Sequence, residues 1–259
     1  MFQSSPRLPE GFRLDLLDET DSTNSEALRR ASRKEDPSLW ILARKQSDGR
    51  GRGSRRWVSD TGNLMTSLLL RPETNLMTAL QLSFVAGVAL QRTLSELLLA
   101  EDNAVDVSLK WPNDVLINHL KVAGILLESV SDSLGQWPYI VVGIGVNVSS
   151  HPEGTEFCAT DLSVHGNVSS VELIFERLAI SMDRMLKVWQ SGRGFESIRN
   201  LWLEVAHKPG ERLIVKNGDS LIKGSFETID SDGALCLKLN AGTIKRILVG
   251  DIYPQPGQI

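Results

Sequence analysis

The residues best suited to chemistry lie in one short segment, Gly49-Arg50-Gly51-Arg52-Gly53-Ser54-Arg55-Arg56-Trp57. Between positions 44 and 56, six cationic side chains accompany a single acid, Asp48. Arginine forks match the oxygens of phosphate and carboxylate groups, and interleaved glycines let the backbone approach such an anion closely. Because neighbouring like charges repel one another, we expect a bare loop to be mobile and an anionic ligand to order it. The segment therefore predicts a loop that closes over a negatively charged ligand.

Two other interpretations of this loop are a solvated surface turn and a nucleic-acid-binding Arg-Gly tract. Such tracts usually form long repeats outside a fold, whereas this one is single and lies between two apolar segments, 40–43 and 63–70. A small anionic ligand fits better. Trp57 would then stack on a base or cover the site, although it could also be an ordinary aromatic residue at a strand edge.

The second motif is Lys110-Trp111-Pro112-Asn113-Asp114, in which the proline forces a tight corner after a strand. Asn113 and Asp114 could be simple turn residues. Alternatively, the corner holds an amide and a carboxylate at a sheet edge, where the carboxylate could orient an amine for attack. Lys121, followed by Val122-Ala123-Gly124, could reach over a flat ligand, although a single strand lysine more often faces solvent.

The elements that must position these residues follow from hydrophobic periodicity. Alternating or continuous apolar runs predict strands over 14–17, 40–43, 63–70, 105–111, 114–117, 121–128 and 139–148. Helical spacing predicts helices from Ser22 or Thr23 to about Arg33, and over 76–100, 170–190 and 194–206. Gly143 and Gly145 would weaken a purely structural strand, so they indicate a place where something lies against the backbone.

Composition limits the class of protein. The 259 residues suffice for one large domain, 1–207, and a small one, 208–259, whose short β-like runs and glycine turns predict an antiparallel barrel. The net charge of 28 − 32 = −4 is unlike that of a protein that coats nucleic acid. Two widely separated cysteines, Cys158 and Cys236, make metal or redox chemistry improbable. No signal peptide is evident, and polar residues interrupt 76–100, so we expect no membrane span and a cytoplasmic protein.

Taken together and in this order, five motifs resemble those of the biotin protein ligases, over roughly position 14 to the end. They are Asp21-Ser22-Thr23-Asn24, Gln46 with Gly49-Arg50-Gly51-Arg52 and Trp57, Lys110-Trp111-Pro112-Asn113-Asp114, Lys121-Val122-Ala123-Gly124-Ile125-Leu126, and Gly143-Ile144-Gly145-Val146-Asn147. The resemblance implies an α+β fold. It comprises a large mixed-sheet catalytic domain with flanking helices, the class II synthetase-like biotin/lipoate ligase core, and a small C-terminal SH3-like barrel.

The resemblance also implies an activity. Biotin would be activated with ATP and Mg²⁺ to biotinyl-5′-AMP and then passed to one lysine of a biotin carboxyl carrier domain. The residues expected to be catalytic are Lys121, Arg52 and Asp114, the last orienting or deprotonating the acceptor lysine. The expected biotin-binding residues are Ser22, Thr23, Asn24, Gln46, Arg50, Gly51, Arg52, Lys121 and Gly124. The expected ATP- or adenylate-binding residues are Arg50, Arg52, Arg55, Trp57, Asn113, Lys121 and Asn147. No protein metal ligand is expected, because Mg²⁺ would be bound through ATP.

Some relatives carry an N-terminal helix-turn-helix and repress transcription, but here the first motif begins at Asp21. We therefore expect a monofunctional ligase that does not bind DNA, with a homodimer possible, as in related enzymes. A lipoate or octanoate ligase is the nearest alternative enzyme, and it is disfavoured by the Arg-Gly loop and the Lys-Trp-Pro-Asn-Asp corner. A non-catalytic biotin or nucleotide sensor would not need an amine-orienting carboxylate such as Asp114.

Overall fold

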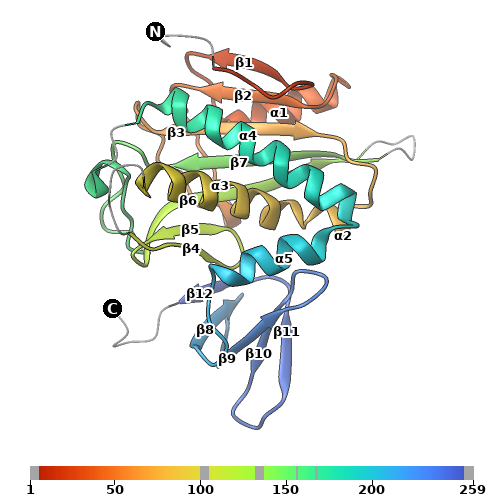
Figure 1. Ribbon diagram of the computed structural model, residues 1–259, viewed down its shortest axis with the longest axis vertical. Helices are drawn as coiled ribbons and strands as arrows, with labels where there is room; N and C mark the ends of the chain where they lie inside the picture. The colour runs from red at the N-terminus through yellow and green to blue at the C-terminus, as the bar shows by residue number, and fades with distance from the viewer. Residues whose placement is uncertain (1–5, 100–104, 132–136, 156, 167–168, 254–259) are drawn as a thin grey trace.

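A seven-stranded mixed sheet forms the centre of the larger part of the protein (Figure 1). The computed structural model describes residues 6–99, 105–131, 137–155, 157–166 and 169–253. The strand order is β1-β2-β3-β7-β6-β5-β4, with β1 parallel to β2 and every other neighbouring pair antiparallel. The strands are β1 (Arg13–Leu17), β2 (Leu39–Ala43), β3 (Leu64–Leu70), β4 (Val107–Lys110), β5 (Asp114–Ile117), β6 (Leu120–Val130) and β7 (Tyr139–Val146). The expected mixed sheet is therefore confirmed.

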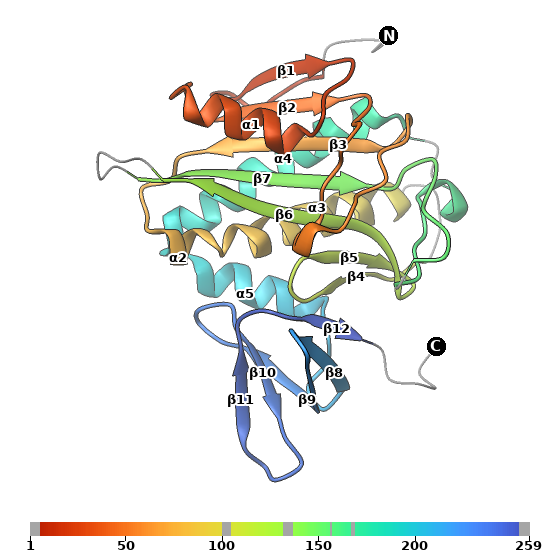
Figure 2. The ribbon, with the colours of Figure 1, turned by 180° about the vertical axis from the view of Figure 1, so that it is seen from behind.

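Helices cover both faces of this sheet. They are α1 (Thr23–Ser32), α2 (Leu76–Ala79), α3 (Leu82–Leu99), α4 (Val171–Trp189) and α5 (Phe195–Glu204). Figure 1 shows α3 and α4 in front of one face, and Figure 2 shows α1 in front of the other. On the first face Trp40 of β2 meets Phe175 of α4 edge to face, with ring centroids 5.4 Å apart. The strands β2 and β3 are buried along their whole length because apolar side chains point to both covered faces.

The single helix predicted over 76–100 is interrupted. Asn75 begins α2 by accepting a hydrogen bond from the Thr78 N–H, and the chain turns at Leu80 and Gln81 before α3 begins. The Gln81 side chain accepts a hydrogen bond of 2.8 Å from the Trp189 indole, which fixes this junction to the end of α4. Within the described residues, Leu76–Leu99 is long and apolar enough to cross a membrane, but most of it is buried in the core.

A separate antiparallel sheet follows α5, in the order β11-β10-β9-β8-β12. Its strands are β8 (Arg212–Asn217), β9 (Ser220–Ile229), β10 (Leu235–Lys238), β11 (Ile244–Ile247) and β12 (Asp251–Tyr253). The short β-like runs that the sequence predicted after 208 form strands of this sheet. The Trp111 indole N–H donates to the Gly233 carbonyl at 3.1 Å, and Arg199 donates to Thr228 Oγ1 at 2.9 Å. These bonds attach the second sheet to the corner after β4 and to α5.

The buried side-chain amide of Asn63 holds the long segment that follows β7. Asn63, just before β3, accepts hydrogen bonds at its Oδ1 from the N–H groups of Val148, Ser149 and Ser150 at 2.8, 3.0 and 3.3 Å. Its Nδ2 donates back to the Ser150 carbonyl at 3.0 Å. The Asn63 side chain, which is 3% exposed, thus pairs with several backbone groups of an irregular segment. Without it these backbone groups would be unpaired.

We predict that Asn63→Ala lowers the free energy of unfolding by about 1–3 kcal/mol, because several buried donors lose their acceptor. Denaturant titration measures the change. The matched control is Asn217→Ala at the exposed end of β8, which should change the free energy by less than about 0.5 kcal/mol. Equal losses in the two variants would contradict the anchoring role of Asn63.

Candidate active site

A cavity of about 350 Å³ opens on the sheet face that carries α1, where the segment after β2 crosses β7 and β6 (Figure 2). The structure brings to its lining all fourteen residues that the sequence put forward for binding or catalysis. They are Ser22, Thr23, Asn24, Gln46, Arg50, Gly51, Arg52, Arg55, Trp57, Asn113, Asp114, Lys121, Gly124 and Asn147. Residues from all five motifs therefore share one site.

One end of the cavity is neutral overall: its uncharged side chains share hydrogen bonds, and the Arg50–Glu128 ion pair beside it carries no net charge. The backbone N–H and hydroxyl of Thr23 both donate to Gln46 Oε1, at 2.8 and 3.1 Å. The Ser67 hydroxyl lies 2.6 Å from Asn24 Oδ1 and 2.8 Å from Thr23 Oγ1. Ser22 occupies the N-cap position of α1, but its hydroxyl makes no capping hydrogen bond. The start of α1 is thus held against β3 by side chains whose positions are fixed.

Two glycines form the floor in the middle of the cavity. Gly124 of β6 and Gly145 of β7 are directly paired in the sheet, and the Trp57 indole lies on both. A Cβ atom on Gly145 would come 2.5 Å from Trp57 Cε2, so no larger residue fits there. On the neighbouring Gly143, a Cβ would overlap the Asn24 side chain. The sequence predicted close contact at Gly143 and Gly145, and the groups in contact are side chains of the protein itself.

The Trp57 indole N–H is buried and has no hydrogen-bond partner among the described residues. The ring also lies 5.7 Å from Lys121 Nζ, measured to the ring centroid. A buried donor without an acceptor is unfavourable in a folded protein, so its position beside the cavity suits a ligand with an acceptor atom.

The basic loop has a defined backbone. Trp57 N–H donates to the Gly49 carbonyl at 2.8 Å, and Gly51 N–H donates to the Arg55 carbonyl at 2.7 Å. Between them lies a short 3₁₀ turn, η1 (Arg52–Ser54). The chain therefore doubles back on itself and places arginines at the cavity while Trp57 returns to the glycine floor.

Acids from distant elements pair with the loop arginines. Arg50 forms a 2.8 Å ion pair with Glu128 of β6. Arg52 and Arg55 both reach the same oxygen of Asp251 in β12, at 3.3 and 3.0 Å. Our sequence argument considered only Asp48 as a partner for these charges, and therefore overestimated their mutual repulsion. The C-terminal sheet thus takes part in shaping the cationic end of the site.

At that end, Asp114 is buried between two lysines. Its Oδ1 lies 2.6 Å from Lys121 Nζ, and its Oδ2 lies 3.4 Å from Lys110 Nζ. Burial raises the pKa of Asp114, but the charges of Lys121 and Lys110 outweigh this effect and hold the pKa below its ordinary value. The ionised carboxylate therefore stabilises the fold at neutral pH, and this contribution is lost as the pH falls through the lowered pKa. Such a carboxylate is a weak proton acceptor, so the geometry suits orientation better than proton removal.

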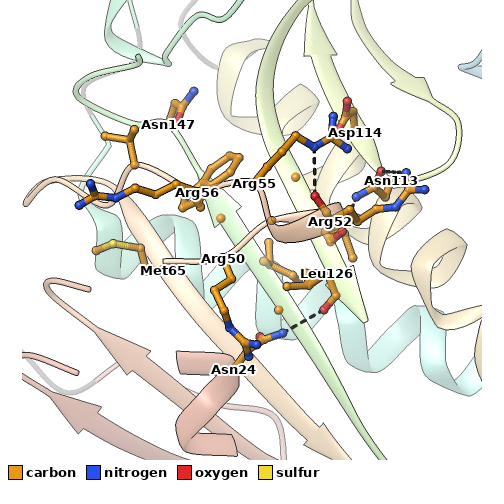
Figure 3. Close-up of a pocket in the computed structure, with 18 of the residues that line it drawn as sticks. Asn24, Arg50, Arg52, Arg55, Arg56, Met65, Asn113, Asp114, Leu126 and Asn147 are labelled. Carbon is orange, nitrogen blue, oxygen red and sulfur yellow. Dashed lines mark hydrogen bonds between the residues drawn. The ribbon is translucent and has the colours of Figure 1, made fainter. Parts of the chain in front are cut away.

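The two ends are well separated in the close-up of Figure 3, with Asn24 and Arg50 on one side and Arg52, Asn113 and Asp114 on the other. Arg52 donates to Asn113 Oδ1 at 3.2 Å, which joins the basic loop to the corner after β4. Apolar residues also line the cavity, among them Val58, Met65 and Leu126. The site can thus hold an elongated molecule with a neutral polar head and an anionic tail.

Sequence reasoning missed several parts of the site. Glu128 and Asp251 pair with the arginines but belong to no motif, and no local signal could identify them. The segment after β7 adds a wall made by Pro152, Thr155, Phe157 and Ala159. Its backbone lies beside the start of β6, where Lys121 N–H donates to the Cys158 carbonyl at 2.9 Å. Asn147 contacts this wall directly, because its side-chain amide donates to the Thr160 carbonyl at 3.0 Å.

Comparison with known proteins agrees with this geometry. The model of the Biotin/lipoate A/B protein ligase family matches residues 16–147, and that of the Biotin protein ligase C terminal domain matches residues 210–253. The chain belongs to the biotin/lipoate A/B protein ligase family. It is 43% identical to the biotin--[acetyl-CoA-carboxylase] ligase of Paracoccus denitrificans, over 88% of this chain and 95% of that protein.

More distant family members also match this chain over most of its length. The bifunctional ligase/repressor BirA of Bacillus subtilis is 31% identical, over 93% of this chain and 74% of that protein. Among solved structures, the biotin protein ligase from Aquifex aeolicus in complex with biotin and ATP is similar with a TM-score of 0.76 and 29% identity. That match covers 93% of this chain and 97% of the other. The likeness therefore includes both sheets.

We predict that Gly145→Ala displaces Trp57 and loosens the basic loop. Trp57 is half-buried, so losing part of its contact, about 1.4 kcal/mol, should speed tryptic cleavage at Arg50 to Arg56 by roughly tenfold. Mass spectrometry of early fragments identifies the cleaved bonds. The control is Gly87→Ala in α3, where an added Cβ meets its nearest neighbour at 3.6 Å. Cleavage of the Gly145→Ala variant at the wild-type rate would show that the glycine floor does not hold the loop.

Proposed function

We propose that this protein activates biotin with ATP, forming biotinyl-5′-AMP and pyrophosphate, and then transfers the biotinyl group to a lysine of a biotin carboxyl carrier domain. One observation carries the proposal: in a chain of this family, a single cavity has a neutral hydrogen-bonding end and a cationic end with apolar walls between them. Biotin has the matching form, with a neutral cyclic urea at one end and a carboxylate at the other.

The neutral end would bind the urea ring of biotin. Ser22, Thr23, Asn24 and Gln46 offer hydroxyl and amide groups there, and hydrogen bonds with one another and with Ser67 already orient the last three. Preorganised polar groups lose little freedom on binding, so they favour specific recognition of a neutral head group. The backbone of the loop at Arg50 and Gly51 and the floor at Gly124 would support the same ligand, with apolar side chains along its tail.

The cationic end would carry out the first step. A biotin carboxylate oxygen attacks the α-phosphorus of ATP, a phosphoanhydride bond breaks, and pyrophosphate leaves with the electron pair. Both reactants are anionic, so Lys121 between carboxylate and α-phosphate, and Arg52 on the phosphate, would lower the electrostatic barrier. Arg55, Trp57, Asn113 and Asn147 would lie along the adenylate.

Magnesium would enter with the ATP phosphates and neutralise part of their charge. The described part of the chain contains no cluster of three metal-ligating side chains, and the two carboxylates at this end are already paired with cations. These pairings are compatible with a metal ion held mainly by the nucleotide.

The second step is aminolysis of the mixed anhydride. The neutral amine of the acceptor lysine attacks the acyl carbon, an amide bond forms, and AMP leaves with the bonding electrons. A lysine with a pKa of about 10.4 is mostly protonated at neutral pH, so the amine must be oriented and lose a proton. Asp114 and Asn113 would orient it at the cavity mouth, while the loop and Trp57 keep water from the anhydride.

The direct test is incubation of the protein with biotin, Mg-ATP and an apo carrier domain. We expect one biotin per carrier domain and one pyrophosphate released for each, measured by intact mass and a coupled assay. Replacing biotin with lipoate should leave the carrier unmodified, because lipoate lacks the urea that the neutral end would bind. If biotin gave neither transfer nor pyrophosphate, the proposed function would be refuted.

A variant separates binding from activation. Lys121→Ala should reduce biotin-dependent ATP–pyrophosphate exchange by at least about a hundredfold, since a cation aimed at developing charge is worth several kcal/mol. Calorimetry should still detect biotin binding at the neutral end. The variant should also fold, because Asp114 keeps Lys110 as a partner. Lys223→Ala, on the exposed side of β9, is the control for loss of one lysine. Near-normal exchange by the Lys121→Ala variant would exclude Lys121 from the reaction.

A further inference from the structure

Lys110 is a largely buried cation that has no role in the proposed mechanism. It ends β4, and its side chain is only 12% exposed. Its Nζ lies 3.4 Å from Asp114 Oδ2, donates to the Ile252 carbonyl at 3.4 Å, and sits 4.0 Å from the centroid of the Phe157 ring. A neighbouring carboxylate and groups from two distant segments therefore hold one ammonium in a fixed place.

The two lysines on Asp114 are not equivalent. Lys121 lines the cavity and approaches Oδ1 at 2.6 Å, whereas Lys110 meets the other oxygen, Oδ2, and does not belong to the lining. Phe157, in turn, packs on Tyr253 of β12 with ring centroids 5.0 Å apart. Lys121 can therefore contact a ligand in the cavity, whereas Lys110 is enclosed between the two sheets.

This difference has an electrostatic consequence. To contact a biotin carboxylate and an α-phosphate, Lys121 must give up part of its contact with Asp114. A carboxylate that is 8% exposed and loses its cation is strongly unfavourable, because neither water nor another charge compensates it. Without a second cation, the ion pair would hold Lys121 away from the ligand.

We propose that Lys110 is a positioning residue for adenylate formation: it remains with Asp114 as a fixed counter-ion, and so allows Lys121 to turn toward the reacting oxygens. This inference rests on the proposed function. The Ile252 carbonyl and the Phe157 ring both attract the Lys110 ammonium in its present position. Lys110 therefore stays in place when Lys121 turns toward the ligand. Through these contacts β12 of the C-terminal sheet contributes to the geometry of the reacting end.

The test is Lys110→Met, which keeps an unbranched side chain one heavy atom shorter and removes the charge. We expect the rate of biotin-dependent ATP–pyrophosphate exchange at saturating substrates to fall by about tenfold or more, because Lys121 is then the sole partner of a buried carboxylate. The biotin dissociation constant, measured by calorimetry, should change by less than about threefold, since the neutral end is untouched. A purely structural defect would not produce this separation of rate from binding.

A double-variant cycle shows whether the effect passes through Asp114. In an Asp114→Asn background there is no carboxylate to retain Lys121, so adding Lys110→Met should cause no further loss of rate. The surface control is Lys187→Met, which removes another lysine paired with a carboxylate four residues away, here Asp183 at 2.7 Å. That variant should exchange at the wild-type rate.

Two results would overturn the inference alone: wild-type exchange by the Lys110→Met variant, or an equal loss from Lys110→Met with and without Asp114→Asn. If Lys110→Met does not fold, the two variants that carry Asp114→Asn decide the question, since equal rates support the inference and a further tenfold loss, about 1.4 kcal/mol, contradicts it. Absence of exchange in the wild-type protein would instead refute the proposed function, and the inference with it.

Discussion

The buried carboxylate of Asp114 organises the cationic end, because two lysines there are paired with it. The corner after β4 sets it at the sheet edge, where Lys121 and Lys110 approach its two oxygens from opposite sides. A buried charge is tolerated only when paired, so these lysines cannot be placed independently. The neighbouring Asn113 then accepts a hydrogen bond from Arg52, which brings the basic loop to the same point.

The loop is held from two directions. Trp57 lies on the paired glycines of β6 and β7, while Arg52 and Arg55 reach Asp251 of the C-terminal sheet. The first contact depends on the absence of side chains from the floor, and the second on a carboxylate supplied by another sheet. In the proposed function, a cover of this kind would exclude water from the reactive anhydride and open for the acceptor. The second sheet is therefore part of the site as well as of the fold.

Local patterns identified most of the fold, and the site residues implied by the resemblance to the biotin protein ligases all line one cavity. Strand runs such as 40–43 and corner residues such as Pro112 carry their structural signal within a few positions. The contacts that could not be predicted depend on long-range pairing: Arg50 meets Glu128 and Arg52 meets Asp251, partners that are 78 and 199 residues away along the chain. The turn between α2 and α3 also escaped, because the apolar spacing continues through it and the stabilising contact comes from Trp189.

The central claim is that the anionic tail and the phosphate meet at the end organised by Asp114. A crystal structure of the protein with biotin and ATP tests this directly. The account predicts the urea ring against Thr23 and Gln46, the α-phosphate within hydrogen-bond distance of Lys121 and Arg52, and Lys110 still paired with Asp114. A ligand bound in the reverse direction, or phosphates lying away from Lys121 and Arg52, would contradict it.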